Sequence, residues 1–177
     1  MTLPEWVSGA LEAGESVIVA AGHNLPQVPE FPLQPVTSRP AALSAAADLL
    51  IQAGVRPRHR EPVEATVDEL VGNALRVDEA PRLGVQVGME SIWVRVADLG
   101  TLSSACVREA LLRAIRAGGA PRRDGDGAGL GLYLTLLRAR TLVFELGSRG
   151  GTTISVELSR GPGGSLRALV IRPGRIG

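Results

Sequence analysis

The sequence predicts an α+β fold, a two-layer sandwich in which helices pack on one face of a mostly antiparallel sheet. Two observations support this class. Four segments between residues 40 and 140 carry apolar residues at helical spacing, and two segments alternate apolar and polar residues around a central turn, as β-hairpins do. The length of 177 residues predicts a single domain. A domain of this size buries roughly two-thirds of the surface that the unfolded chain exposes.

The first thirty residues are predicted to be an extension that precedes the domain. A short amphipathic piece, "LPEWVSGALEAG", is followed by the β-branched run "SVIVAA" and then by "GHNLPQVPEFP", where prolines end regular structure. We expect residues 1–30 to form this extension, residues 31–160 the domain, and residues 161–177 a tail with one more short strand.

The first half of the domain is expected to hold two helices and a hairpin. The helical pattern "PAALSAAADLLIQAG" begins with Pro40 in its first turn and ends at Gly54, a residue typical of helix C-termini. A second helix fits "EPVEATVDELVGNALRV". The segment "RLGVQVGMESIWVRVADLG" alternates around a turn near residues 88–91, which predicts a hairpin.

The second half of the domain is expected to hold two more helices and a second hairpin. A third helix fits "SSACVREALLRAIRAGG", the loop "APRRDGDGAG" follows, and a fourth helix fits "LGLYLTLLRAR". The segment "TLVFELGSRGGTTISVELS" then predicts a second hairpin with its turn at residues 148–151. In the third helix Cys106 is expected to be a small packed residue.

The composition excludes several classes of function. One cysteine permits no internal disulfide, and His23 and His59 lack a cluster of ligands at metal spacing. The absence of lysine excludes a Walker-type phosphate lysine and a Schiff-base lysine. With a net charge of +1, nothing points to nucleic acid or to a membrane surface. The first fifteen residues are acidic rather than basic, so we expect a cytoplasmic protein.

Glu69 and Asn73 are candidate functional residues on the second helix. They are four positions apart, so their side chains are neighbours on the helix and can contact the same small ligand. Together with Thr66 they are expected to lie away from the apolar face of the helix. The alternative is that they belong to an ordinary solvated face.

Two further features point to a ligand. Asp98 ends an apolar strand immediately before the turn at Gly100, where a carboxylate lies at a sheet end; the alternative is a helix cap or turn former. The stretch "DGDGAGLGLYL" places four glycines within residues 125–131 and continues into a helix. A glycine-rich turn that opens a helix is typical of phosphate binding, because the free N–H groups and the helix dipole attract anions.

Taken in order, these segments resemble the histidine-kinase-like ATPases, a superfamily that includes the catalytic domains of sensor kinases and the anti-sigma-factor serine kinases. "ELVGNAL" is similar to its N box, "DLG" to the start of its G1 box, "GDGAGLGL" to its G2 box and "GTT" to its last nucleotide-side motif. The resemblance spans residues 31–158, and the leading segment "FPLQPVTSRPAAL" is most similar to the anti-sigma kinase branch.

The resemblance implies a role for each residue in binding ATP and Mg²⁺. Asp98 would accept the exocyclic amine of adenine, and Gly100 would let the base approach the backbone. Asn73 would supply an oxygen to Mg²⁺, and Glu69 would position or deprotonate the attacking water or hydroxyl. The remaining residues implied are Gly127, Gly129 and Gly131, which would wrap the phosphates, and Thr152 or Thr153, which would help seat the base.

Leu102 departs from the family pattern. It stands where the second glycine of the G1 box starts a mobile lid, and a leucine there would resist positive φ and could fill part of the pocket mouth. Arg122 and Arg123 of the lid could contact the γ-phosphate, or could simply be solvated. Two functions stay open: a serine/threonine kinase that binds a sigma factor and phosphorylates an antagonist, or a degenerate module that acts only by protein contact. A second copy of the chain is a further candidate partner.

Overall fold

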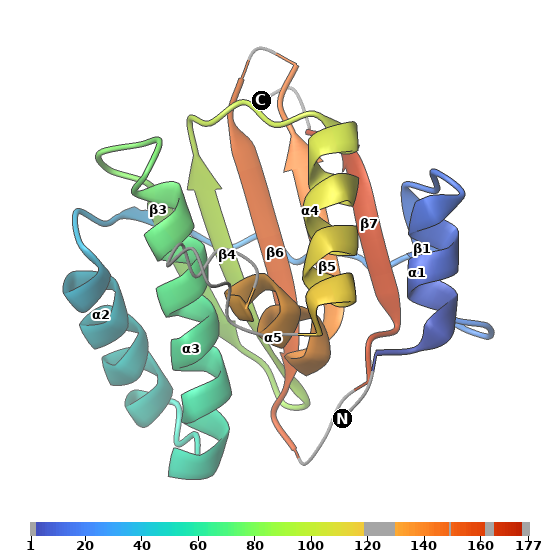
Figure 1. Ribbon diagram of the computed structural model, residues 1–177. Helices are drawn as coiled ribbons and strands as arrows, with labels where there is room; N and C mark the ends of the chain where they lie inside the picture. The colour runs from blue at the N-terminus through green and yellow to red at the C-terminus, as the bar shows by residue number, and fades with distance from the viewer. Residues whose placement is uncertain (1–2, 119–129, 149, 162–164, 175–177) are drawn as a thin grey trace.

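The computed structural model describes residues 3–118, 130–148, 150–161 and 165–174. These residues form a seven-stranded sheet and five helices, which confirms the α+β class (Figure 1). The helices are α1 (Glu5–Glu12), α2 (Arg39–Gln52), α3 (Pro57–Ala74), α4 (Ser104–Ala117) and α5 (Leu130–Arg138). The strands are β1 (Val17–Val19), β2 (Gln34–Pro35), β3 (Arg82–Val87), β4 (Ser91–Asp98), β5 (Ala139–Leu146), β6 (Thr152–Ser159) and β7 (Ala168–Pro173).

The sheet has the order β1-β7-β5-β6-β4-β3-β2. The two predicted hairpins are present as β3–β4 and β5–β6, and every neighbouring pair is antiparallel except β5 and β7. The strand predicted after residue 160 is β7, and β2 was not predicted. The division of the chain at residues 30 and 160 stays a prediction, while α1 and β1 pack with the rest of the chain around one core.

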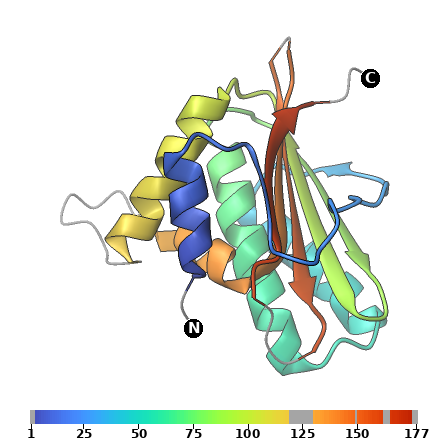
Figure 2. The ribbon, with the colours of Figure 1, turned by 90° about the vertical axis from the view of Figure 1, so that its right-hand side faces the viewer.

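Helices α3, α4 and α5 lie over one face of the sheet, with α2 and α1 at its two sides (Figures 1 and 2). On α3 the apolar residues Val63, Val67 and Val71 recur at every fourth position and are fully buried. The expectation for Thr66 was wrong: it is 1% exposed, because it lies between buried Val63 and Leu70 on the helix surface. Its hydroxyl donates to the Pro62 carbonyl at 2.8 Å, which satisfies it in the core.

The expectation for Cys106 was also wrong, because this residue is exposed. The buried face of α4 consists of Val107, Leu111 and Ala114, and Cys106 lies about 100° around the helix from Val107. The cysteine is therefore outside the apolar stripe.

The segment of residues 20–33 covers part of the other face of the sheet (Figure 1). A Cβ atom at Gly84 would lie 2.6 Å from Leu33 Cδ2 and 2.8 Å from Phe31, so the segment crosses β3 where only glycine leaves room. The buried residues of this face include Val143, Ser155 and Val170. In the described part of the chain, no helix is long and apolar enough to cross a membrane.

Candidate functional site

Asp98 lies at the end of β4, opposite Thr152 at the start of β6. The Gly100 amide donates to Asp98 Oδ1 at 2.7 Å, and the Thr152 hydroxyl donates to the Gly100 carbonyl at 3.1 Å. The Gly151 amide donates to the same carbonyl, also at 3.1 Å. Three of the predicted residues, Asp98, Gly100 and Thr152, are therefore brought together.

The Asp98 carboxyl has a pKa above its ordinary value. Burial is the main cause, since it disfavours the charged form, and the nearby Asp78 carboxylate adds to it; the Gly100 hydrogen bond opposes the rise. Among the described residues Oδ2 of Asp98 accepts no hydrogen bond, which leaves this oxygen to receive one from a ligand.

Gly100 packs against Val77, a residue shortly after the end of α3. A Cβ atom at this position would lie 2.8 Å from Asp98 Oδ1 and 3.0 Å from Val77 Cγ2, so a side chain would displace the turn. Val77 follows the last residue of α3 by three positions, and Asn73 precedes Val77 by one helical turn. The end of α3 that carries Asn73 is therefore next to the Asp98 turn.

Glu69 and Asn73 contact each other on α3, as their spacing predicts. The Asn73 side-chain amide donates from Nδ2 to Glu69 Oε1 at 2.8 Å, which leaves the amide oxygen of Asn73 to coordinate a cation. Asn73 is exposed, and Glu69 is half-buried. The residues present thus fit a Mg²⁺ ion that takes its other ligands from phosphates and water.

The Glu69 carboxylate lies against the first turn of α5. A Cβ atom at Gly131 would lie 1.9 Å from Glu69 Cδ, so the carboxylate occupies the space that any other residue would fill. Glu69 and Gly131 together line a cavity of about 250 Å³. A carboxylate is favoured at a helix N-terminus, where backbone N–H groups lack partners inside the helix.

Other predicted residues are placed differently. Gly127, Gly129, Arg122 and Arg123 lie outside the described residues. Since side chains alternate along a strand, Thr153 shares a face with Ala97 and Glu145 rather than with Asp98. Thr152 is thus the threonine on the Asp98 face.

Leu102 is 44% exposed in the loop before α4. No described residue other than glycine has a positive φ, so the leucine is free of that strain. The following residue, Ser103, caps α4 by accepting the Cys106 amide at 3.1 Å. Leu102 therefore lies directly before the N-cap of α4, which begins at Ser104.

A buried ion cluster near the Asp98 turn was not predicted. Glu145 is 6% exposed and accepts hydrogen bonds from Arg95 Nη2 at 3.3 Å and from Arg172 Nη2 at 2.9 Å. A carboxylate inside the apolar run "TLVFEL" is the sequence signal that could have revealed it, because a buried carboxylate needs a cationic partner.

Comparison with known proteins yields a similarity to a solved structure. A chain of the SiaB–SiaC complex from Pseudomonas aeruginosa matches with a TM-score of 0.48 and 17% sequence identity, over 71% of this chain and 86% of that chain. No protein-family model matches the sequence, and no curated protein matches it. A statement about function therefore rests on the residues of the site.

Proposed function

We propose that the chain is an ATP-binding regulatory protein of the histidine-kinase-like type, which binds a protein partner and phosphorylates a serine or threonine hydroxyl. The observation that carries this proposal is the contact between Glu69 and the first turn of α5. It joins two motifs that are far apart in the sequence, the Glu69 carboxylate with its neighbouring amide and the end of a glycine-rich segment.

In this proposal each residue has a distinct task. Asp98 accepts the adenine amine with its free oxygen, Oδ2, and Thr152 holds the Gly100 backbone in place beneath the base. Asn73 offers its amide oxygen to Mg²⁺. ATP supplies the phosphoryl group. Glu69 accepts the proton of the attacking hydroxyl, whose oxygen bonds to the γ-phosphorus as the bond to ADP breaks.

A second candidate function is a module that binds its partner without phosphotransfer. The specific observation in its favour is Leu102 at the position of the second G1 glycine. The partner in either case is a sigma factor or a similar regulator, as the resemblance to anti-sigma kinases suggests.

Calorimetric titration with ATP, with and without Mg²⁺, tests the proposal. We expect saturable binding to the wild type and a loss of about tenfold or more in Asp98→Asn, because the amide presents a donor where adenine also donates. Asp48→Asn is the matched control, since Asp48 is exposed on α2. Absence of binding to the wild type would leave the contact-only module, and unchanged affinity in Asp98→Asn would remove Asp98 from the site.

A further inference from the structure

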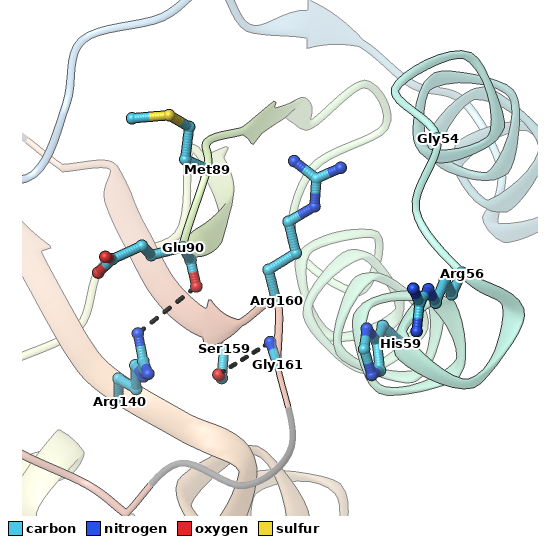
Figure 3. Close-up of a pocket in the computed structure, with 9 residues that line it drawn as sticks. All are labelled: Gly54, Arg56, His59, Met89, Glu90, Arg140, Ser159, Arg160 and Gly161. Atoms are coloured by element: carbon cyan, nitrogen blue, oxygen red, sulfur yellow. Dashed lines mark hydrogen bonds between the residues drawn. The ribbon is translucent and has the colours of Figure 1, made fainter.

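A second cavity lies at the opposite end of the sheet from Asp98. It has a volume of about 620 Å³ and is bounded by the β3–β4 turn, which leads into the start of β4, by the end of β6 and by the start of α3 (Figure 3). Strand β4 spans the distance between the two ends, about 23 Å at the usual rise per residue. We call this second cavity the basal cavity. Its volume is within the range of small-molecule sites.

The basal cavity has an excess of positive charge. Arg56, Arg140 and Arg160 line it, and in the described part of the chain none of the three forms an ion pair. Glu90 is the acidic residue of the lining, and its carboxylate points away from Arg56 and Arg160 (Figure 3). Uncompensated cations in a concave surface concentrate positive potential there.

Two of the arginines are held by the backbone rather than by carboxylates. Arg160 donates to the Gly88 carbonyl at 2.9 Å and to the Ala53 carbonyl at 3.1 Å. Arg140 donates to the Glu90 carbonyl at 3.5 Å, and its Nε is buried without a hydrogen-bond partner in the described chain. The guanidinium groups are thus positioned before any ligand arrives, which lowers the entropic cost of binding.

The N-terminus of α3 adds to the same potential. Arg56 is its N-cap, no side chain caps the helix there, and the first turn holds no acidic residue. Arg56 and His59 both line the basal cavity. A cation at the positive end of a helix dipole is unfavourable, and an anion in the cavity would relieve it.

We propose that the basal cavity binds a small phosphate-bearing molecule. Guanidinium groups match the oxygens of a phosphate with paired N–H donors, and three arginines line one concave surface next to a helix N-terminus. The cavity is larger than a phosphate group alone, so it accommodates a substituent, and the exposed Met89 offers an apolar contact at the rim.

Pyrophosphate in the presence of EDTA is the probe. NMR spectra of the arginine Nε–Hε groups, recorded at constant ionic strength, should show saturable shifts at Arg140 and Arg160. We expect Arg140→Gln to weaken binding about tenfold and Arg56→Gln about threefold. Arg113→Gln is the control, because it removes the same positive charge from α4, where Arg113 forms an exposed ion pair. The pyrophosphate affinity of this variant should equal that of the wild type.

Three results would overturn the proposal. They are the absence of saturable shifts at these two arginines in the wild type, an unchanged affinity in both Arg140→Gln and Arg56→Gln, and an equal response to malonate, which would exclude a preference for phosphate. Thermal unfolding of each variant ensures that a loss of binding is not a loss of folding. Arg56 is exposed, so Arg56→Gln should fold normally. This variant therefore still tests the proposal if Arg140→Gln proves unstable.

Discussion

At the scale of single residues, the chemistry of Asp98 depends on its partial burial. Burial raises the pKa of the carboxyl, so the folded state favours the protonated form more than the unfolded chain does. The charge therefore reduces the stability of the fold above the folded-state pKa, and this cost disappears below the unfolded-state pKa, near 3.9. A carboxylate kept at such a cost fits a residue that serves a ligand.

The first prediction concerns pH. If the adenine amine donates to the Asp98 carboxylate, ATP affinity should fall as the pH decreases through the raised pKa of Asp98, because the protonated group has lost acceptor capacity. Titrations at a series of pH values between about 4 and 8 would measure the fall. The phosphate groups of ATP also titrate in this range. The pH profile of Asp98→Asn, which lacks the carboxyl group, measures their contribution to the change in affinity. Identical pH profiles for the two proteins would contradict the assigned role.

The second prediction concerns Gly131. Alanine there would place its Cβ 1.9 Å from Glu69 Cδ, so the carboxylate must move and its hydrogen bond to Asn73 should break. Because Glu69 is a flexible side chain and alanine favours the helix, we expect stability to change by about 1 kcal/mol or less. ATP turnover should fall as far as in Glu69→Ala.

Gly9→Ala is the matched control for this substitution. Gly9 is also helical, and an added methyl group would have no other atom within 4 Å, so the variant should gain about 0.5–1 kcal/mol and keep its turnover. The Asn73 side-chain amide signal in NMR spectra reports the displaced carboxylate directly. A Gly131→Ala protein with wild-type turnover and an unshifted Asn73 signal would show that the Glu69 position is unimportant.

At the scale of elements, the Glu145 cluster links β5 to its neighbour β7 and also to β4, which has no backbone pairing with β5. Arg95 reaches Glu145 from β4, across β6, while Arg172 approaches from the neighbouring strand β7; the two arginines remain 22% and 32% exposed. A buried ion pair adds little net stability, but removal of one partner leaves unpaired charge in a region of low dielectric.

The third prediction follows from this cluster. Glu145→Gln should lower the free energy of unfolding by about 3 kcal/mol, since two partly buried guanidinium groups lose their counter-ion. Glu109→Gln removes the same charge from the exposed pair with Arg113 and should cost about 0.5 kcal/mol or less. Denaturant unfolding measures both values. Equal costs would mean that the Glu145 cluster is solvated.

The elements that the sequence predicted are those with a strong periodic signal. The hairpin β3–β4 alternates in β3, the hairpin β5–β6 joins a β-branched and apolar run to a glycine-containing turn, and α3 has apolar residues at every fourth position. Its start was predicted at residue 61 rather than at Pro57, because polar residues fill the first turn. Strand β2 has two residues and no period, so its pairing with β3 depends on the path of the chain.

The site was predictable only in part for a similar reason. Spacing alone indicated the contact between Glu69 and Asn73. The contact of Glu69 with Gly131 and the link from Gly100 to Val77 depend on how α3 packs against α5 and β4, which local pattern does not encode. The basal cavity combines Arg56 with Arg140 and Arg160, which lie at the open end of the β5–β6 hairpin, and none of these residues belongs to a motif.

At the scale of the whole molecule, the predicted site residues form two groups. Asp98, Gly100 and Thr152 lie at the ends of β4 and β6, while Glu69, Asn73 and Gly131 lie at α3 and the start of α5. The chain between β4 and α5, which includes α4, connects the two groups. In the proposed function a nucleotide contacts both groups, so we expect its affinity to depend on the described part of this connection, residues 99–118.

The last prediction concerns Leu102, which lies at the start of this connection. It precedes Ser103, the N-cap with extended backbone, so residue 102 lies two positions before α4 begins at Ser104. Leucine restricts φ there, and glycine would remove the restriction. We expect Leu102→Gly to raise ATP affinity or turnover about threefold or more. The stability cost should be about 1 kcal/mol or less, because Leu102 is exposed in a loop.

Leu25→Gly is the control for this substitution, since Leu25 is also an exposed loop leucine but lies in the segment that crosses the other face of the sheet. It should lose similar stability with no gain in ATP affinity, as measured by calorimetry and thermal unfolding. If a folded Leu102→Gly protein binds and turns over ATP no better than the wild type, Leu102 does not limit the site. A protein that acts only by contact would then need another explanation, and residues 119–129 would be the next to vary, because they lie between α4 and α5 in the sequence.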